Sequence, residues 1–200
     1  MRALPPRLVL ATTNRGKLAE VTAILGARGV EVVAAVALVP DWHVAEENAT
    51  FAENARAKAV DLARHAGIPA LGDDSGLDVA ALGGRPGVRS ARYAGEGASD
   101  AANTARLLEE LRDVPEGQRA AVFRCALALA WPDGAVVEAE GSCEGTIART
   151  PRGSGGFGYD PIFVDPETGL TFAELPAAVK NARSHRRRAL EALRARLGPQ

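Results

Sequence analysis

Two carboxylates stand side by side in residues 72–76, GDDSG, and they are the residues of this chain best suited to chemistry. Asp73 and Asp74 would repel one another unless a cation or hydrogen-bond donors compensate them, so a hard divalent ion such as magnesium is a natural partner. The flanking glycines favour a loop over a helix interior. A second acidic pair, Glu46-Glu47, precedes a predicted helix. Solvated acidic loops are the alternative interpretation of both pairs.

A second cluster has the residue types of a phosphate site. An apolar strand over residues 7–12 runs through small polar residues into a helical pattern. Such a helix start offers free backbone N–H groups and a positive helix end to an anion, and a lysine adds a full charge. The segment does not match the P-loop pattern, and simple N-capping by Thr13 or Asn14 is the alternative. The candidate residues are Thr12, Thr13, Asn14, Arg15, Gly16 and Lys17.

A third cluster combines aromatic and cationic residues. Phe157 and Tyr159 lie in a glycine-rich loop and could stack a flat ring, in a chain with only 4% aromatic residues. Further along, Lys180, His185 and Arg186 lie at or before the start of the last helix, where cations oppose the helix dipole unless an anion or a carbonyl offsets them. A solvated basic turn is the alternative. A magnesium nucleotide would fit all of these clusters.

The elements that must position these clusters alternate between strands and helices. Strands are predicted at residues 7–12 and 30–36, helices after residue 15 and over 51–66, with Thr50 and Glu53 at capping-box spacing. A helix near 102–113, a hairpin over 121–143 and a final helix over 186–197 follow. This order predicts an α/β protein with a mixed sheet, and we expect residues 1–200 to form one domain.

The composition excludes several classes of protein. The formal net charge of −1 gives no overall attraction to nucleic acid or to an anionic membrane. The N-terminal apolar run is too short for a signal or a membrane span, so we expect a soluble, cytoplasmic protein. Cys125 and Cys143 lack neighbours at metal-ligand spacing, and we interpret both as reduced packing residues.

Several strings together resemble the inosine triphosphate pyrophosphatase family. They are ATTNRGKLAEV, TFAENARAKA, GDDSGLDVAALGGRPGVRSARYAGE, GSGGFGYDP and KNARSHRRRAL. The resemblance covers residues 8 to 197 in order, and the joint occurrence of these strings is specific where no single one suffices. The seven residues before Leu8 form an extension to which the resemblance assigns no role.

The resemblance implies magnesium-dependent hydrolysis of non-standard purine triphosphates, namely ITP, dITP and XTP, to the monophosphate and pyrophosphate. It implies a homodimer of elongated, two-lobed protomers with a central cleft. Asp74 matches the expected general base, and Asp74 and Glu46 match the metal ligands. The stretch between the Glu46-Glu47 pair and Thr50 is one residue shorter than is usual in the family. Glu47 therefore stays open as the alternative to Glu46. The substrate residues that match are Thr12 to Lys17, Lys58, Ser75, Phe157, Gly158, Tyr159, Asp160, Lys180, His185 and Arg186.

Three other functions compete with this one. The basic start of the last helix could contact RNA or DNA, but its electrostatic footprint is short and no stacking pattern of aromatics accompanies it. An enzyme of related type could cleave other nucleotides, such as modified pyrimidine triphosphates. A purely structural dimerisation protein would leave the acidic clusters without a partner.

Overall fold

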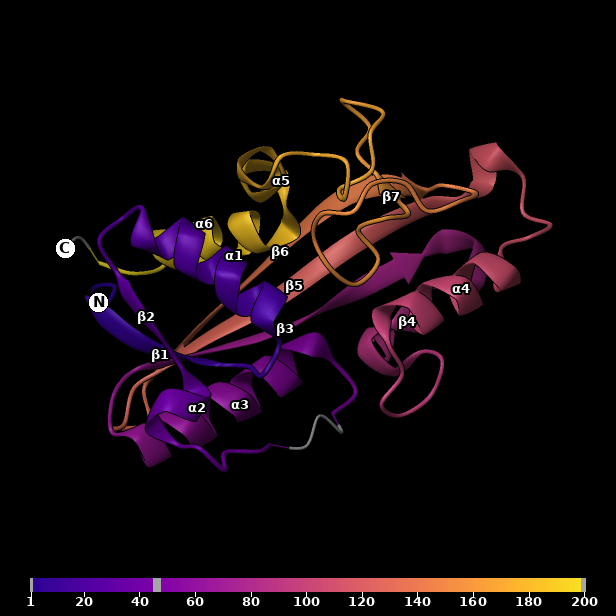
Figure 1. The fold of residues 1–200 in the computed structure, drawn as a ribbon. Coiled ribbons are helices and arrows are strands. Elements are labelled where there is room, and N and C mark those ends of the chain that lie inside the picture. Colours follow the sequence, from indigo (N-terminus) through magenta and orange to yellow (C-terminus); the bar gives the residue numbers. More distant parts are fainter. Residues whose placement is uncertain (1, 45–47, 199–200) are drawn as a thin grey trace. The chain divides into compact units, whose positions relative to one another are not determined.

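The structure, a computed structural model, describes residues 2–44 and 48–198, and its strands and helices are shown in Figure 1. The strands are β1 Arg7–Ala11, β2 Glu31–Ala34, β3 Ala70–Val79, β4 Pro86–Gly87, β5 Ala120–Ala130, β6 Val136–Ile147 and β7 Phe163–Val164. The helices are α1 Arg15–Gly26, α2 Ala35–Leu38, α3 Phe51–Ala66, α4 Asp100–Glu110, α5 Ala177–Arg183 and α6 His185–Ala195. None of these helices is both long and apolar enough to cross a lipid bilayer.

The strands form one mixed sheet, which confirms the predicted α/β class. Their order is β2-β1-β3-β5-β6-β7, with β4 paired to β3. Strand β1 runs parallel to both β2 and β3, while β4 and β7 pair antiparallel with their neighbours. The predicted hairpin is present as β5 and β6, and the turn between them is closed by a hydrogen bond from Gly134 N to Trp131 O.

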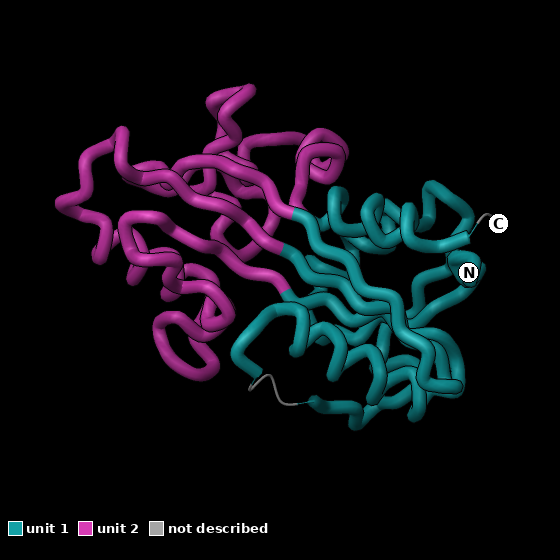
Figure 2. The backbone as a smooth tube through the Cα atoms, turned by 180° about the vertical axis from the view of Figure 1, so that it is seen from behind, with its two compact units in different colours: residues 1–74, 125–141, 186–200 teal, residues 75–124, 142–185 magenta. Residues whose placement is uncertain are grey.

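The chain divides into two compact units, each with its own core (Figure 2). Unit 1 comprises Met1–Asp74, Cys125–Gly141 and Arg186–Gln200, and unit 2 comprises Ser75–Arg124 and Ser142–His185. Strands β3, β5 and β6 each contribute residues to both units. The expectation of one domain over residues 1–200 stays a prediction, and we describe each unit by itself.

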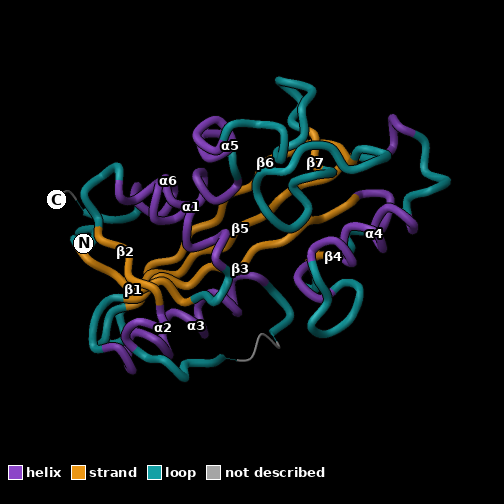
Figure 3. The backbone as a smooth tube through the Cα atoms, in the orientation of Figure 1, coloured by secondary structure: helices purple, strands orange, loops and turns teal. Residues whose placement is uncertain are grey.

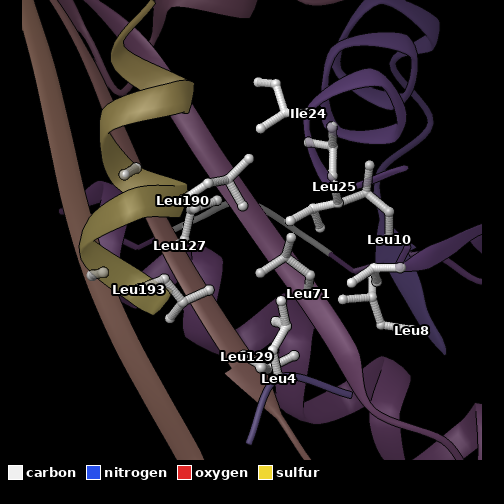
Figure 4. Packing of buried hydrophobic residues seen from close by; sticks show 14 of the residues in the cluster. Leu4, Leu8, Leu10, Ile24, Leu25, Leu71, Leu127, Leu129, Leu190 and Leu193 are labelled. Atoms are coloured by element: carbon white, nitrogen blue, oxygen red, sulfur yellow. The ribbon is translucent and has the colours of Figure 1, made fainter. Parts of the chain in front are cut away.

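In unit 1, helices α1 and α6 cover one face of the strands and helices α2 and α3 cover the other (Figure 3). Alternation along β1 divides its side chains between these faces. Leu8 and Leu10 enter a leucine-rich layer with Leu71, Leu127 and residues of α1 and α6 (Figure 4). This layer contains the predicted helical stripes of the first and last helices, and its large side chains separate those helices from the sheet.

The opposite face of unit 1 is lined by alanines. Ala55 and Ala59 of α3 pack there with small residues of β1, β3 and β5. A Cβ built on Gly72 of β3 would lie 2.0 Å from the carbonyl oxygen of Ala55, closer than real atoms approach. Gly72 has an ordinary backbone conformation, so what requires glycine there is the close approach of α3 to the strand.

Helix α3 has the predicted boundaries. Thr50 and Glu53 form the capping box, and Gly67 ends the helix with φ of 68°. The buried face of α3 is not purely apolar, because Asn54 and Lys58 are buried whereas Ala52 and Ala66 are only partly buried. Two polar side chains one turn apart therefore face the sheet.

Two predictions of local structure were wrong. Residues 35–36, expected in a strand, begin helix α2. The GDDSG segment, expected in a loop, lies inside the ten-residue strand β3. A glycine weakens a strand only modestly, and here Gly72 gives α3 room to approach, so packing outweighs the local preference for a loop.

Unit 2 has an aromatic core. The Phe123 and Phe163 rings lie 4.3 Å apart between centroids, and Phe172 packs on Phe163 at 4.9 Å. Leu107 of α4, on the predicted apolar stripe of that helix, is fully buried in the same cluster. Tyr159 also belongs to this core.

We expect Gly72→Ala to destabilise the protein by about 3 kcal/mol, because the added methyl group meets backbone rather than a flexible side chain. Urea unfolding followed by circular dichroism measures the loss. Gly26→Ala is the matched control: it lies at the end of α1 with no atom within 4 Å, and its stability should change by less than about 1 kcal/mol. Equal midpoints for Gly72→Ala and wild type would contradict the close approach.

Candidate active site

The connection from β1 to α1 forms an open helix start. Asn14 is the N-cap, and its side chain accepts a hydrogen bond from Lys17 N at 3.0 Å. Thr12 Oγ1 accepts another from Asn14 N at 3.1 Å. Thr13, Asn14 and Arg15 are exposed, and Thr12, Gly16 and Lys17 are half-buried. Of the two residues proposed for N-capping, Asn14 has that role, and the cap leaves the positive helix end beside exposed polar residues.

The two adjacent aspartates are separated by the strand that contains them. Successive side chains of a strand point to opposite faces, and Asp73 contacts α1 and α6 residues whereas Asp74 contacts α3 residues. The sequence analysis expected a cation or hydrogen-bond donors to compensate the pair, and both carboxylates have donors here. Each carboxylate has its own partners, so their environments differ although they are neighbours in sequence.

Asp73 is the centre of a buried ion-pair network. Its side chain is fully buried, with Lys17 Nζ at 2.9 Å from Oδ1 and Arg186 Nε at 2.6 Å from Oδ2. Arg186, itself 1% exposed, also pairs with Glu20. Two cations and two carboxylates thus neutralise one another, three of them buried and Lys17 half-buried.

Electrostatics hold these groups in their charged forms. Burial acts to raise the pKa of Asp73, but the charges and hydrogen bonds of Arg186 and Lys17 outweigh it and keep that pKa well below 3.8. Burial acts to lower the pKa of Lys17, yet the negative charges of Asp73 and Asp74 raise it above 10.5. Burial, followed by the charge of Asp73, raises the pKa of the Cys125 thiol, so this cysteine is a neutral packing residue.

Asp74 is held on the other face by two residues of α3. Asn54 Nδ2 donates to Asp74 Oδ2 at 2.9 Å, and Lys58 Nζ lies 3.7 Å from Oδ1. Lys58 also donates to the main-chain oxygen of Asp73 at 2.6 Å. Unit 1 therefore brings Asp74 and Lys58 together.

A magnesium site can be tested only in part within the described residues. Glu46 and Glu47 lie outside them. Over residues 2–44 and 48–198, no three His, Cys, Asp or Glu side chains gather as a ligand set. Asp74 nonetheless supplies a carboxylate, and protein-bound Mg²⁺ commonly uses one or two carboxylates with water and substrate phosphates. The donor chemistry of Asp74 therefore fits such an ion.

Unit 2 gathers a second group of predicted site residues. Asp160 accepts a hydrogen bond from Phe157 N at 2.8 Å and forms an ion pair with Lys180. Lys180 Nζ also lies 4.7 Å from the centre of the half-buried Phe157 ring. A Cβ on Gly156 would lie 2.0 Å from the Asp160 carboxylate, so glycine is needed for this loop to fold around Asp160. Gly158 N donates to Asp100 at 2.6 Å.

Tyr159 and His185 lie in the core of unit 2. Tyr159 is 5% exposed and its hydroxyl donates to Ser90 O at 2.9 Å, so its ring is no open stacking surface beside Phe157. His185 stacks on Phe123 at 4.8 Å, and its Nδ1 lies 4.0 Å from Cys143 Sγ. Cys143 is buried and outside any disulfide, as predicted. Ser75, half-buried in β3, is the first residue of unit 2.

Sequence analysis missed Glu20 and Asn54. Both are polar, both lie inside helices, and both are at most 6% exposed. The available signal was helical spacing: Asn54 precedes Lys58 by four residues, which places both on one face of α3. Arg186 was expected at the nucleoside base, and its contacts with Asp73 and Glu20 indicate a structural role as well.

Comparison with known proteins gives consistent matches along nearly the whole chain. A model of the Ham1 family matches residues 8–196. A dITP/XTP pyrophosphatase of Geobacter sulfurreducens is 52% identical over 193 residues, covering 96% of each chain. One from Geobacillus kaustophilus is 53% identical over 186 residues, covering 93% of this chain and 91% of the relative. A solved HAM1 protein from Coxiella burnetii superposes with a TM-score of 0.83 at 43% identity, covering 94% of this chain and 96% of its own.

We expect Asp73→Asn to destabilise the protein by about 3–5 kcal/mol at pH 7, because the change leaves buried cations without their carboxylate. The folded-state pKa of Asp73 is lowered, so its contribution is present above pH 3.8 and is lost as pH falls through the lower folded-state value. Urea unfolding from pH 7 to pH 2 should show a difference from wild type that stays constant down to pH 3.8 and narrows below it. A difference that stays constant down to pH 2 would contradict this account.

Proposed function

The chain belongs to the Ham1 family, and from that premise we propose that it hydrolyses ITP, dITP and XTP to the nucleoside monophosphate and pyrophosphate. The observation that carries the proposal is the near-full-length similarity to proteins named dITP/XTP pyrophosphatase, at about half identical residues. Lys17 and Lys58 both donate to the main-chain oxygen of Asp73, and with Asp74 they supply side chains suited to a phosphate anhydride.

Residues of unit 1 have the phosphate roles in this proposal. The exposed N-terminus of α1 donates main-chain N–H groups to phosphate oxygens, and Lys17 adds a positive charge. Asp73 holds the ammonium of Lys17 in place from the buried side. Catalysis of phosphoryl transfer depends mostly on such positioning and on neutralising charge.

The reaction itself needs a base for the attacking water. Asp74 accepts a proton from the water as its oxygen bonds to the α-phosphorus. The bond from that phosphorus to the oxygen bridging to the β-phosphorus breaks, and pyrophosphate leaves with the electron pair. We propose that Asp74 and Glu46 hold Mg²⁺, which when bound neutralises charge on the phosphate oxygens.

Residues of unit 2 have the base-recognition roles. Lys180 and His185 offer donors, and the Phe157 ring offers a stacking surface. A 6-oxo purine accepts hydrogen bonds where adenine would present a donor. A buried mismatch of this kind discriminates by about four to five powers of ten.

The arginine run at the start of α6 offers little support for a nucleic-acid partner. Arg186 is buried with Asp73 and Glu20, and Arg187 pairs with Glu191 at 2.6 Å. The arginine run therefore presents less free positive charge than the sequence indicates, and we propose a function without a nucleic-acid partner. The formal net charge of −1 also gives no overall attraction to an anionic membrane, so we propose no membrane partner.

We expect pyrophosphate release from ITP, dITP and XTP at rates at least about a hundred times those with ATP, because the site donates to a 6-oxo group that adenine lacks. GTP, whose guanine also carries a 6-oxo group, and dTTP complete the substrate panel. Asp74→Asn should lower kcat by about 10²–10⁴. A coupled pyrophosphate assay measures both, and EDTA should abolish release until Mg²⁺ is restored. Preference for dTTP would indicate the modified-pyrimidine alternative, and normal turnover by Asp74→Asn would remove this residue from catalysis.

We also propose that the enzyme is a cytoplasmic homodimer, on the strength of the family resemblance. Sedimentation equilibrium at micromolar concentration should give twice the chain mass. The chain mass alone would overturn the dimer without affecting the proposed reaction.

A further inference from the structure

The buried amide of Asn54 links helix α3 to Asp74 of strand β3 and to Asn48, which precedes the helix. Asn54 lies in α3 and is 1% exposed. Its Nδ2 donates to Asp74 Oδ2 at 2.9 Å, and its Oδ1 accepts from Asn48 N at 3.1 Å and from Asn48 Nδ2 at 3.0 Å. We propose that Asn54 is a positioning residue that fixes the Asp74 carboxylate in the orientation needed to activate water. The proposal rests on the proposed function.

The contacts of Asn54 determine which way its amide faces. An amide oxygen can only accept and an amide nitrogen can only donate. Because two N–H donors of Asn48 meet Oδ1, the Nδ2 end must face Asp74. A flipped amide would set its oxygen against a carboxylate oxygen, so Asn48 selects the orientation in which Asn54 donates to Asp74.

Asp74 needs such a contact because its terminal torsion is soft. The rotation of a carboxylate about χ2 has broad preferences and no deep wells. Asn54 holds Oδ2, and Lys58, one helical turn further along the same face, lies 3.7 Å from Oδ1. Both oxygens are thus held from one rigid helix, whose distance from β3 is set by the contact at Gly72.

An asparagine at this position costs free energy of folding, and packing alone does not account for its presence. Asparagine is less favourable than alanine inside a helix by several tenths of a kcal/mol. A buried amide also costs free energy unless it is hydrogen-bonded. Ala55 and Ala59 fill neighbouring positions of the same face without either cost. The amide is therefore retained for its directed contacts.

A purely structural role would have Asn54 only anchor Asn48 to α3. Asn54→Asp separates the two roles, because a carboxylate still accepts from Asn48 but replaces the donor to Asp74 with a like charge. Asn54→Ala removes both contacts. Asn103→Ala is the matched control: Asn103 is also a helical asparagine, 2% exposed, whose amide bonds main-chain groups of Ala91 and Ala94.

The experiment measures kcat and KM for the preferred triphosphate, with urea unfolding of each variant. Both Asn54 variants should lose about 10- to 100-fold in kcat, since a misplaced catalytic group costs about that much. Their KM should stay within about threefold, since Asn54 has no assigned phosphate or base contact. Asn103→Ala should lose stability but keep its kcat. Wild-type kcat in Asn54→Asp, or an equal kcat loss in Asn103→Ala, would overturn the proposal.

A second measurement needs no turnover and separates this inference from the proposed reaction. The side-chain carboxyl ¹³C resonance of Asp74, assigned by its absence from Asp74→Asn, reports the local environment of that carboxylate. It should shift in Asn54→Ala and stay in place in Asn103→Ala. An unchanged Asp74 resonance in Asn54→Ala would overturn the positioning role. If the resonance shifts in Asn54→Ala but the wild-type protein hydrolyses none of the triphosphates, only the proposed reaction is overturned. If Asn54→Asp fails to fold, Asn54→Ala and its control decide the question.

Discussion

The ion pairs of Asp73 are the interaction on which the arrangement of unit 1 depends. One fully buried carboxylate in β3 contacts Lys17 of α1 and Arg186 of α6, and Arg186 extends the network to Glu20. Burying charges is costly, and the pairing repays that cost only if every partner stays in place. The network therefore specifies how two helices lie on the strand more than it adds stability. The network also fixes the position of the Lys17 ammonium group.

The packing of the two faces of the sheet explains why the partners of Asp74 differ from those of Asp73. On the Asp73 face, leucines separate α1 and α6 from the sheet, so only long side chains such as Lys17 and Arg186 bridge to the strand. On the Asp74 face, alanines and Gly72 let α3 approach closely. A side chain as short as Asn54 then reaches the carboxylate directly.

Much of the fold could be predicted from the sequence because its signals are local. The hairpin of β5 and β6 was predicted, and so was the Thr50–Glu53 capping box at the start of α3. The GDDSG strand could not be predicted, since its glycine is explained by a helix that arrives from elsewhere in the chain. The contacts of Arg186 were missed for the same reason, because Asp73 is 113 residues away in sequence.

The two adjacent aspartates show how a strand gives neighbouring like charges separate surroundings. Two adjacent aspartates predict repulsion only if their side chains share one environment. A strand places them on opposite faces, and each then acquires its own neighbours. One carboxylate is enclosed by cations that keep it ionised and structural, while the other meets a directed donor and a lysine. Different environments are how proteins give two like groups different tasks. Here the alternation of a single strand, together with a thick leucine layer and a thin alanine layer, produces that difference between residues joined by one peptide bond.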